Sequence, residues 1–548
     1  MCNNIFKIEL PSIESIESKY KARGLSSGQK VTRFAPSPTG FMHIGGLYAA
    51  LISERVAHQS NGVFYLRIED TDKKREIEDA IQLIIKTLYF YGVIPDEGFN
   101  LDSVEKGEYG PYQQSFRKLI YQAYVKKLLD EGKAYPCFLS VEELENIRKE
   151  QEISGDRPGY YGKWAKSREL TEPEEKQKID AGIPFVIRFK SNGNYNKKIR
   201  IKDYLKGERE FPENDLDVVI MKADGLPTYH FAHVIDDHLM GTTHVIRGDE
   251  WFPSLPLHIQ LFKCMGWKAP EYVHISPIEK LEGTSRRKLS KRKDPEANMS
   301  FYEEQGYPKE AVIEYLLNLA NANFEDWRRQ NNTKHYNEFK LELRKLNASG
   351  ALFDINKLNN ISKNIIGKMT PLDIFNCSYQ WAKDHDKQLV EYIERDQEYV
   401  QKILAIERTN VSPERVRKDI AKWSDVKFEV NYFFDEYFNG LKDVIMQNLT
   451  FMNHEDIYKI VSDFLSIYNE NDNKNEWFEK ILQLASKYGY AKNAKELRTS
   501  PNLFKGNVSD VAKVFRVILT GRTQTPDLHS IMQVMGKERV IKRLKLYI

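Results

Sequence analysis

The segment 31–92 most constrains the fold, because short β-rich runs alternate there with amphipathic helical runs. "VTRFA" from Val31 and "VFYLRI" from Val63 have the composition of buried strands. A helix is predicted near Gly45–His58, and apolar residues at 3.6-residue spacing predict another over "REIEDAIQLIIKTLYFYG", with Gly92 as its stop. Strand–helix–strand–helix order favours a parallel sheet covered by helices.

The rest of the chain contains several further patterns. At 548 residues it exceeds what one hydrophobic core usually supports, so three or more domains are expected. Residues 1–29 resemble a helical extension, and helices with polar loops interrupt the α/β pattern from about Tyr112 to Pro212. The α/β pattern resumes with "TYHFAHVIDD", "THVIRGDEW" and "YVHIS", and past Lys293 amphipathic helices dominate.

Composition excludes several classes of protein. No uncharged apolar run approaches the ~18–20 residues that span a bilayer. The N-terminus lacks the features of a secretory signal or a transit peptide, so we expect a cytoplasmic protein without a membrane anchor. The four cysteines, which are far apart, form no C-x-x-C pair and predict neither a disulfide framework nor a complete cysteine-based zinc site: Cys2, Cys137, Cys264 and Cys377.

The stretch "RFAPSPTGFMHIGG" joins the first strand to its helix. Ligands of α/β sheets bind outside the C-terminal ends of the strands, and a helix N-terminus favours a phosphate. Gly45 and Gly46 would let a nucleotide approach the backbone, and His43 can donate to a phosphate oxygen. A lone histidine beside glycines is more often an ordinary loop residue, so this stretch alone does not decide the function.

A second element changes that balance. "KLSKR" lies in "EGTSRRKLSKRKD", predicted to be a mobile loop, and Lys288 and Lys291 there are three residues apart. Two such lysines can reach the β- and γ-phosphates of a nucleotide. The combination of "HIGG" and "KLSKR" on an α/β pattern resembles the two signatures of the class I aminoacyl-tRNA synthetases. The resemblance implies ATP as a substrate, with Mg²⁺ as the counter-ion of its phosphates.

Four further motifs resemble the glutamyl-tRNA synthetase branch: "RFAPSPTGFMHIGG", "FYLRIEDTD", "LPTYHFAHVIDDHLMGTTHVIRGDEW" and "KLSKRKD". The C-terminal region from "NLFKGNVSD" resembles the helical anticodon-binding end of the bacterial type. The resemblance implies a Rossmann-like α/β catalytic domain with an inserted acceptor-binding domain, followed by an all-α half. The implied boundaries are an N-terminal extension at 1–29, the catalytic domain at 30–111 and 213–293, the insertion at 112–212, a helical stem-contact domain at 294–375 and a helical anticodon-binding domain at 376–548.

A glutamate pocket must pair two carboxylates and one ammonium, because breaking a buried ion pair typically costs ~3–5 kcal/mol. Arg33 and Arg247 offer planar forks that suit carboxylates, and Glu69 is available for the ammonium. The resemblance assigns glutamate binding to Arg33, Ala35, Ser37, Glu69, Tyr229 and Arg247. It assigns ATP binding to His43, Gly45, Glu250, Leu281, Lys288, Ser290 and Lys291, catalysis to His43, Lys288 and Lys291, and the tRNA 3′ end to Asp72.

The implied reaction has two steps and no covalent enzyme nucleophile. The glutamate α-carboxylate attacks the α-phosphorus of ATP, and the terminal ribose hydroxyl of tRNA(Glu) then attacks the glutamyl-adenylate. The implied partners are ATP, L-glutamate and tRNA(Glu), and a monomer is expected. Family behaviour implies that tRNA must bind before glutamate is activated.

Two departures from the family pattern stand out. Tyr48 and Ala49 follow the glycines where the family often has Arg-Thr, which can change the packing beneath the loop. Many bacterial members have a zinc knuckle that begins Cys-x-Cys. Here Cys137 stands alone with Leu139 at the partner position, and "YYGKW" lacks the later cysteine, so no zinc site is expected.

Other interpretations remain open. A glutaminyl enzyme is disfavoured by the Ala35–Ser37 pattern and the helical C-terminal region, and the short relative that glutamylates a modified tRNA base is disfavoured by chain length. A catalytically silent tRNA-binding paralogue is disfavoured by His43, Lys288, Lys291 and Glu250. Residue by residue, "RIEDTD" can be a surface ion-pair cluster, Arg247 with Glu250 a structural salt bridge, and Tyr229 with Trp251 core packing.

Overall fold

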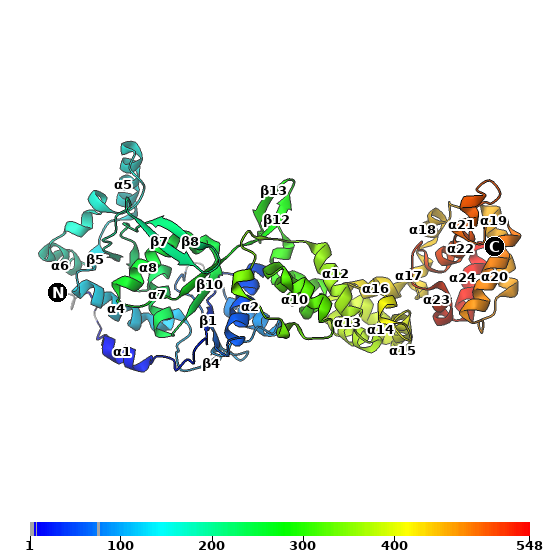
Figure 1. Cartoon of the computed structure of the whole chain (residues 1–548), viewed down its shortest axis with the longest axis horizontal. Coiled ribbons are helices and arrows are strands. Elements are labelled where there is room, and N and C mark those ends of the chain that lie inside the picture. Colours follow the sequence, from blue (N-terminus) through cyan, green and yellow to red (C-terminus); the bar gives the residue numbers. More distant parts are fainter. Residues whose placement is uncertain (1–4, 7, 74–76) are drawn as a thin grey trace. The chain divides into compact units, whose positions relative to one another are not determined.

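The computed structural model describes residues 5–6, 8–73 and 77–548 (Figure 1). The chain divides into two compact units, Met1–Phe301 with Ile313–Asp354 and Tyr302–Val312 with Ile355–Ile548. The predicted segment 294–375 contributes residues to both units, and the predicted domain boundaries stay predictions. None of the helices in the described ranges has both the length and the apolar character that a bilayer span needs.

The first parallel strand pair confirms the expectation from segment 31–92. Strand β1 (Val31–Phe34) pairs with β2 (Val63–Leu66), and the largely buried α2 (Ile44–His58) connects them. The turn before β2 needs a glycine, because a Cβ at Gly62 would collide with the backbone of Lys30. The crossover brings the start of α2 to the C-terminal end of β1.

A second parallel pair lies beside the first. Strand β10 (His244–Gly248) pairs with β11 (Glu271–Ile275), and α8 (Leu255–Cys264) lies between them in the chain. The Thr243 N–H donates to the Val31 carbonyl at 3.0 Å, which places the start of β10 alongside that of β1. Helix α7 (Tyr229–Leu239) precedes β10. The C-terminal ends of β1 and β10 therefore lie at the same edge of the sheet region.

Helix α3 (Ala80–Phe90) is shorter than predicted. Asp79 has a left-handed φ of 62°, which interrupts the backbone before the helix can extend toward Ile77. The part of the expectation that falls on Arg75 and Glu76 lies outside the described residues. The helix ends as predicted, with Gly92 at φ 72°.

The insertion has its own small antiparallel sheet. Strands β5 (Ala134–Cys137), β6 (Val186–Phe189) and β9 (Val219–Met221) form it in the order β5-β6-β9. The β-rich runs "PFVIRF" and "DVVIMK" contain β6 and β9. The other elements of this region and the one before it are β3 (Gly98–Phe99), β4 (Glu105–Lys106), α4 (Lys118–Asp130), α5 (Val141–Ser154), α6 (Glu172–Asp180), β7 (Lys198–Asp203) and β8 (Gly207–Pro212).

Among the described residues of the N-terminal extension, the helical ones are those of α1 (Ile13–Lys19). Its Ile16 is buried in the same core as Tyr121 and Tyr124 of α4. Arg23, after the helix, makes an ion pair of 2.7 Å with Glu97. The extension is thus packed on the catalytic unit.

The stretch predicted as a mobile loop contains an antiparallel hairpin, which corrects that expectation. Strands β12 (Ile278–Glu282) and β13 (Ser285–Lys288) pair with Glu279 opposite Lys288 (Figure 1). A short strand, β14 (Ala351–Leu352), pairs with β12 in parallel, so the region past Lys293 is not entirely helical. The hairpin registry fixes where Lys288 lies.

The remaining elements are helices. Those that contribute to the first unit or connect it to the second are α9 (Met299–Gln305), α10 (Lys309–Ala320) and α11 (Asn323–Gln330). The second unit continues with α12 (Ile355–Ile366), α13 (Pro371–His385), α14 (Lys387–Arg395), α15 (Gln397–Ala405), α16 (Ser424–Asn431), α17 (Asp435–Asn439), α18 (Lys442–Asn448), α19 (His454–Ile467), α20 (Lys474–Lys487), α21 (Ala494–Thr499), α22 (Val508–Thr520), α23 (Leu528–Met535) and α24 (Lys537–Leu544). Its core packs apolar faces of helices together, for example Phe464 of α19 against Phe515 of α22.

Candidate active site

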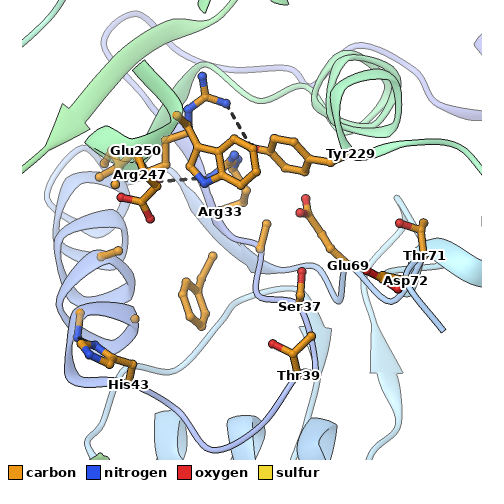
Figure 2. A pocket seen from close by; sticks show the side chains of 18 of the residues that line it. Arg33, Ser37, Thr39, His43, Glu69, Thr71, Asp72, Tyr229, Arg247 and Glu250 are labelled. Carbon is orange, nitrogen blue, oxygen red and sulfur yellow. Dashed lines mark hydrogen bonds between the residues drawn. The ribbon is translucent and has the colours of Figure 1, made fainter. Parts of the chain in front are cut away.

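A cavity of about 1170 Å³ lies at the C-terminal ends of β1 and β10 (Figure 2). Its wall comes from β1, the start of α2, the loop after β2, α7, β10 and the β12–β13 hairpin. The predicted residues that line it are Arg33, Ala35, Ser37, His43, Gly45, Glu69, Asp72, Tyr229, Arg247, Glu250, Lys288 and Lys291. Segments more than 250 residues apart in the chain thus meet in one site.

Two predicted ATP-binding residues are not among the described residues that line this cavity. Leu281 lies on β12 and is half exposed. Ser290 follows the hairpin, and its backbone N–H donates to Asp294 at 2.9 Å. Their assignment stays a prediction from the family resemblance.

Arg247 presents its guanidinium from β10 to the cavity. Its Nη1 donates to the Tyr229 hydroxyl at 3.1 Å, its Nε to Nε2 of His274 at 3.0 Å, and its Nη2 to Nδ1 of His258 at 3.1 Å. Tyr229 packs on Trp251 with ring centroids 4.1 Å apart. The proposed Arg247–Glu250 salt bridge is not observed, since Glu250 lies 3.6 Å from Lys288 instead.

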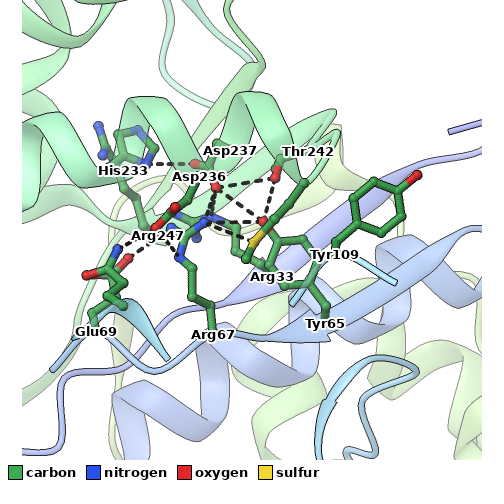
Figure 3. Close-up of polar contacts among 12 residues, drawn as sticks. Arg33, Tyr65, Arg67, Glu69, Tyr109, His233, Asp236, Asp237, Thr242 and Arg247 are labelled. Carbon is green, nitrogen blue, oxygen red and sulfur yellow. Dashed lines mark hydrogen bonds and ion pairs between the residues drawn. The ribbon is translucent and has the colours of Figure 1, made fainter. Parts of the chain in front are cut away.

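A layer of buried ion pairs supports the cavity floor (Figure 3). Arg67 is fully buried and contacts Asp237 at 2.7 Å and Glu69 at 2.9 Å, and Arg117 contacts Asp236 at 2.7 Å. Arg67, Glu69 and Asp70 are all buried, so the interpretation of "RIEDTD" as a surface cluster is wrong for these residues. Sequence reasoning did not identify Asp236 and Asp237. Tyr229, His233 and Asp237 recur every four residues in "YHFAHVIDD", which places them on one helix face and was a usable signal for Asp237.

Glu69 faces the cavity from the loop after β2. Burial raises the pKa of its carboxyl, while the charges of Arg67 and Arg33 oppose that rise. The Arg33 Nε lies 3.5 Å from Asp237, so this arginine is already partly compensated. A ligand ammonium beside Glu69 would stabilise its ionised form.

His43 is the N-cap of α2. Its Nδ1 accepts from the Gly45 N–H at 2.9 Å, and its Nε2 lies 3.3 Å from the Leu289 carbonyl oxygen. An accepting Nδ1 leaves the proton on Nε2, so the ring donates toward the loop that follows the hairpin. Burial, together with Lys291 and Lys288, lowers the pKa of His43, which favours this neutral form.

The two signature lysines, Lys288 and Lys291, line the cavity from the end of the hairpin and the turn after it. Lys288 ends β13 and is more than half exposed, while Lys291 donates to the Phe41 carbonyl in the first signature loop. Burial lowers the pKa of Lys291. Asp294 holds this turn, because it accepts from Arg287 at 2.6 and 2.9 Å.

The departures from the family pattern have a structural setting. Tyr48 is buried at 3% exposure and lines the cavity with Ala49. The Cys137 thiol contacts the Tyr160 hydroxyl at 3.7 Å and Ser167 Oγ at 3.5 Å, within a small apolar cluster. Within the described ranges, no group of three or more His, Cys, Asp or Glu side chains is placed to hold a metal ion. The expected absence of zinc stays a prediction.

Comparisons with known proteins cover nearly the whole chain. Residues 29–360 match the model of the class I tRNA synthetase (E and Q) catalytic domain, and 503–548 match an anticodon binding domain. Glutamate–tRNA ligase of Clostridium perfringens is 48% identical over 100% of this chain and 99% of its own length. That of Acetivibrio thermocellus is 46% identical over 96% and 95%, respectively.

Two solved structures have a similar fold. A glutamate tRNA ligase from Elizabethkingia meningosepticum, solved in complex with its amino acid, is 28% identical with a TM-score of 0.73, over 95% of this chain and 99% of that one. Glutamate-tRNA synthetase from Elizabethkingia anophelis is 30% identical with a TM-score of 0.71 over the same shares. Because almost half of all residues are identical to a relative of matching length, the chain belongs to the glutamate–tRNA ligase family of class I tRNA synthetases.

Proposed function

We propose that the chain ligates L-glutamate to the 3′ end of tRNA(Glu), with ATP as the energy source and glutamyl-adenylate as the intermediate. One observation carries the proposal: the Arg33 and Arg247 guanidinium groups, the Glu69 carboxylate and the His43–lysine group line a single cavity. That set matches the charges of glutamate and of a triphosphate. Family membership supports the same reaction.

In the proposed complex, Arg247 and Tyr229 bind the side-chain carboxylate, Glu69 binds the ammonium and Arg33 contributes to the α-carboxylate. The α-carboxylate oxygen attacks the α-phosphorus of ATP, the bond to the bridging oxygen of the β-phosphate breaks, and pyrophosphate leaves. The ribose hydroxyl of the tRNA then attacks the activated carbonyl and AMP leaves. Positioning and charge stabilisation supply the acceleration in both steps.

His43, Lys288 and Lys291 have the proposed catalytic roles. Nε2–H of His43 would exchange its contact with the Leu289 carbonyl for a phosphate oxygen. The lysines would neutralise the departing pyrophosphate. Mg²⁺ would be carried by the phosphates, because Mg²⁺ commonly keeps several waters and binds through phosphate oxygens plus one or two carboxylates.

The acceptor end of tRNA(Glu) is proposed to enter beside Asp72, which lines the cavity on the side of the insertion. A monomer is proposed, because every residue assigned to the two small substrates comes from one unit of one chain. A cytoplasmic location is proposed with it, since tRNA, ATP and free glutamate occur together there.

Two assays test the function. Purified tRNA(Glu) and tRNA(Gln) are charged with labelled glutamate and with labelled glutamine, and ATP–pyrophosphate exchange is measured with and without tRNA. We expect glutamate-dependent charging of tRNA(Glu) and exchange that requires tRNA. Glutamine-dependent exchange would instead identify a glutaminyl enzyme, and tight tRNA binding without exchange a silent paralogue.

A further inference from the structure

Arg247 differs from the other buried arginines around the cavity in what its guanidinium contacts. Arg67, Arg33 and Arg117 each lie beside Asp236 or Asp237. The polar contacts of Arg247 are to two imidazoles and one hydroxyl. No carboxylate in the described part of the chain lies within ion-pair distance of it. Its positive charge is thus held by neutral partners.

The geometry fixes the protonation of both histidines. A guanidinium only donates hydrogen bonds, so the nitrogens that face it, Nε2 of His274 and Nδ1 of His258, must be unprotonated. Each ring can then hold a proton only on its other nitrogen. Both rings are therefore neutral in the arrangement observed.

A second partner fixes each of these rings in turn. His274 Nδ1 donates to Asp203 Oδ2 at 2.7 Å, and the other oxygen of Asp203 accepts from the Leu205 and Lys206 N–H groups at 2.9 and 2.7 Å. His258 Nε2 lies 2.9 Å from His230 Nδ1, to which it donates. Asp203, His258 and His274 are all fully buried. The side chains behind Arg247 thus form a rigid support.

The support leaves donors for a ligand. Of the five N–H donors of a guanidinium, one on Nε and one on each terminal nitrogen are used by His274, Tyr229 and His258. One N–H on each terminal nitrogen is left. Two such donors match the two oxygens of a carboxylate, whereas a carboxamide has one oxygen and an NH₂ that cannot accept.

We propose that His258 and His274 are positioning residues that set the selectivity of the site for glutamate over glutamine. By accepting from Arg247 as neutral groups, they orient its guanidinium and leave its charge for the side-chain carboxylate of the substrate. A carboxylate in their place would orient Arg247 equally well but compensate its charge in advance. This inference rests on the proposed function, in which Arg247 binds that carboxylate.

The test compares three replacements of one histidine in the full-length protein. His258→Asn keeps a neutral acceptor, His258→Asp supplies a charged one and His258→Leu supplies none. Steady-state aminoacylation of tRNA(Glu) gives KM for glutamate, KM for ATP and kcat, and exchange in the presence of tRNA(Glu) compares glutamate with glutamine. His244→Asp is the matched control. His244 lies on β10, the strand of Arg247, but its side chain contacts Thr243 and Tyr204 instead of Arg247.

We expect His258→Asp to raise KM for glutamate about 30-fold while KM for ATP changes by less than about twofold, since a compensated guanidinium loses most of its attraction for the substrate carboxylate. The preference for glutamate over glutamine should fall with it. His258→Asn should stay within about threefold of the parent, and His258→Leu should lie between them. His244→Asp should leave the glutamate-to-glutamine ratio unchanged.

Equal effects of His258→Asn and His258→Asp would overturn the proposal, because a purely structural role does not distinguish the charge of the acceptor. His274→Gln and His274→Glu repeat the comparison from the other side of Arg247, and they decide the matter if either His258 variant loses its native circular dichroism. A parent protein that fails to charge tRNA(Glu) with glutamate would instead refute the proposed function.

Discussion

At the scale of single residues, the imidazole of His43 has one nitrogen that caps a helix and one that faces the cavity. Its Nδ1 caps α2 through the Gly45 N–H, and its Nε2 proton lies on the cavity side. The cap therefore selects the tautomer that can donate to a phosphate. Local sequence motifs made this residue predictable. Of its two partners, Gly45 is two positions away and Leu289 belongs to the second signature, "KLSKR".

Gly45→Ala should damage the site through this contact. A Cβ at this position would lie 3.1 Å from His43 Nδ1, so the ring must shift to make room. We expect tRNA-dependent ATP–pyrophosphate exchange to fall about tenfold, with tRNA affinity unchanged. Gly46→Ala is the control, since its Cβ would meet Met42 and Phe34 only at an ordinary 3.6 Å. A larger loss in Gly46→Ala would contradict the role given to the cap.

The same helix carries a pH-sensitive residue at its other end. Hydrogen bonds to Asp96 and Glu54 raise the pKa of His58 to about 9. A raised pKa means that the stabilisation is complete below the unfolded-state value of about 6.5 and is lost as pH rises through about 9. The Tm difference between the parent and His58→Gln should therefore be constant below pH 6.5 and shrink between 6.5 and 9.

His244→Gln serves as the comparison for His58. Burial lowers the pKa of His244 to about 4, so this ring is neutral in both the folded and the unfolded chain above about pH 7.5. Its Tm difference from the parent should not change between pH 7.5 and 9. A parallel decline in both variants would show that the His58 ion pairs are not responsible.

At the scale of elements, the β12–β13 hairpin sets the position of the second signature. Its register places Lys288 opposite Glu279, and Asp294 closes the turn beyond it by accepting from Arg287 and Ser290. These hydrogen bonds from Arg287 and Ser290 also hold the pKa of Asp294 below its usual range. The lysines thus extend from a braced turn.

Asp294→Asn should loosen that turn without unfolding the protein. We expect kcat for adenylate formation to fall about five- to tenfold, because the lysines would spend less time near the phosphates, while KM for glutamate stays within about twofold. Glu282→Gln is the matched control, since Glu282 also contacts Arg287, at 2.8 Å, but is exposed. Equal losses in the two variants would remove the special role of Asp294.

The fold was predictable wherever local patterns decide it. The strands β1 and β2 follow from β-rich runs, and the helix α2 between them lies where it was expected, near Gly45–His58. The hairpin was missed because "SRRK" is polar and exposed and is held by pairing with β12. The start of α3 was missed because one residue, Asp79, takes a left-handed conformation.

The site was predictable only in part for a similar reason. Family motifs contain the predicted residues that line the cavity, whereas the supports of Arg247 come from α8, β11 and the end of β7. His258 and His274 are 16 positions apart and Asp203 lies 55 positions before His258, so no local spacing connects them. Only the folded sheet brings them together.

At the scale of the whole molecule, we ask whether the protein needs a structural zinc ion in its insertion. Cys137 packs among Tyr160, Trp164 and Ile147, and the Cys-x-Cys partner position is Leu139, an apolar residue packed against the same cluster. This small core can hold the segment by burial of apolar side chains, a role that a zinc knuckle has in many relatives.

The intact protein should therefore contain no stoichiometric zinc. Elemental analysis of the purified protein should give a zinc content well below one equivalent, and aminoacylation with excess Mg²⁺ should survive 1,10-phenanthroline. EDTA is the contrasting treatment, since it removes the Mg²⁺ that accompanies ATP and should stop the reaction. Zinc at one equivalent together with loss of activity in phenanthroline would contradict this expectation.

The ion pairs beneath the cavity also constrain how this protein can change over generations. Arg67 contacts Asp237 and Glu69 and lies 3.7 Å from Asp236, so replacing Arg67 removes the cation that these three buried carboxylates share. Changing these charges one at a time should therefore destabilise the fold, because an unpaired buried charge is costly. We expect these four positions to vary jointly or not at all, which makes the floor of the pocket a slow-moving part of an otherwise adaptable chain.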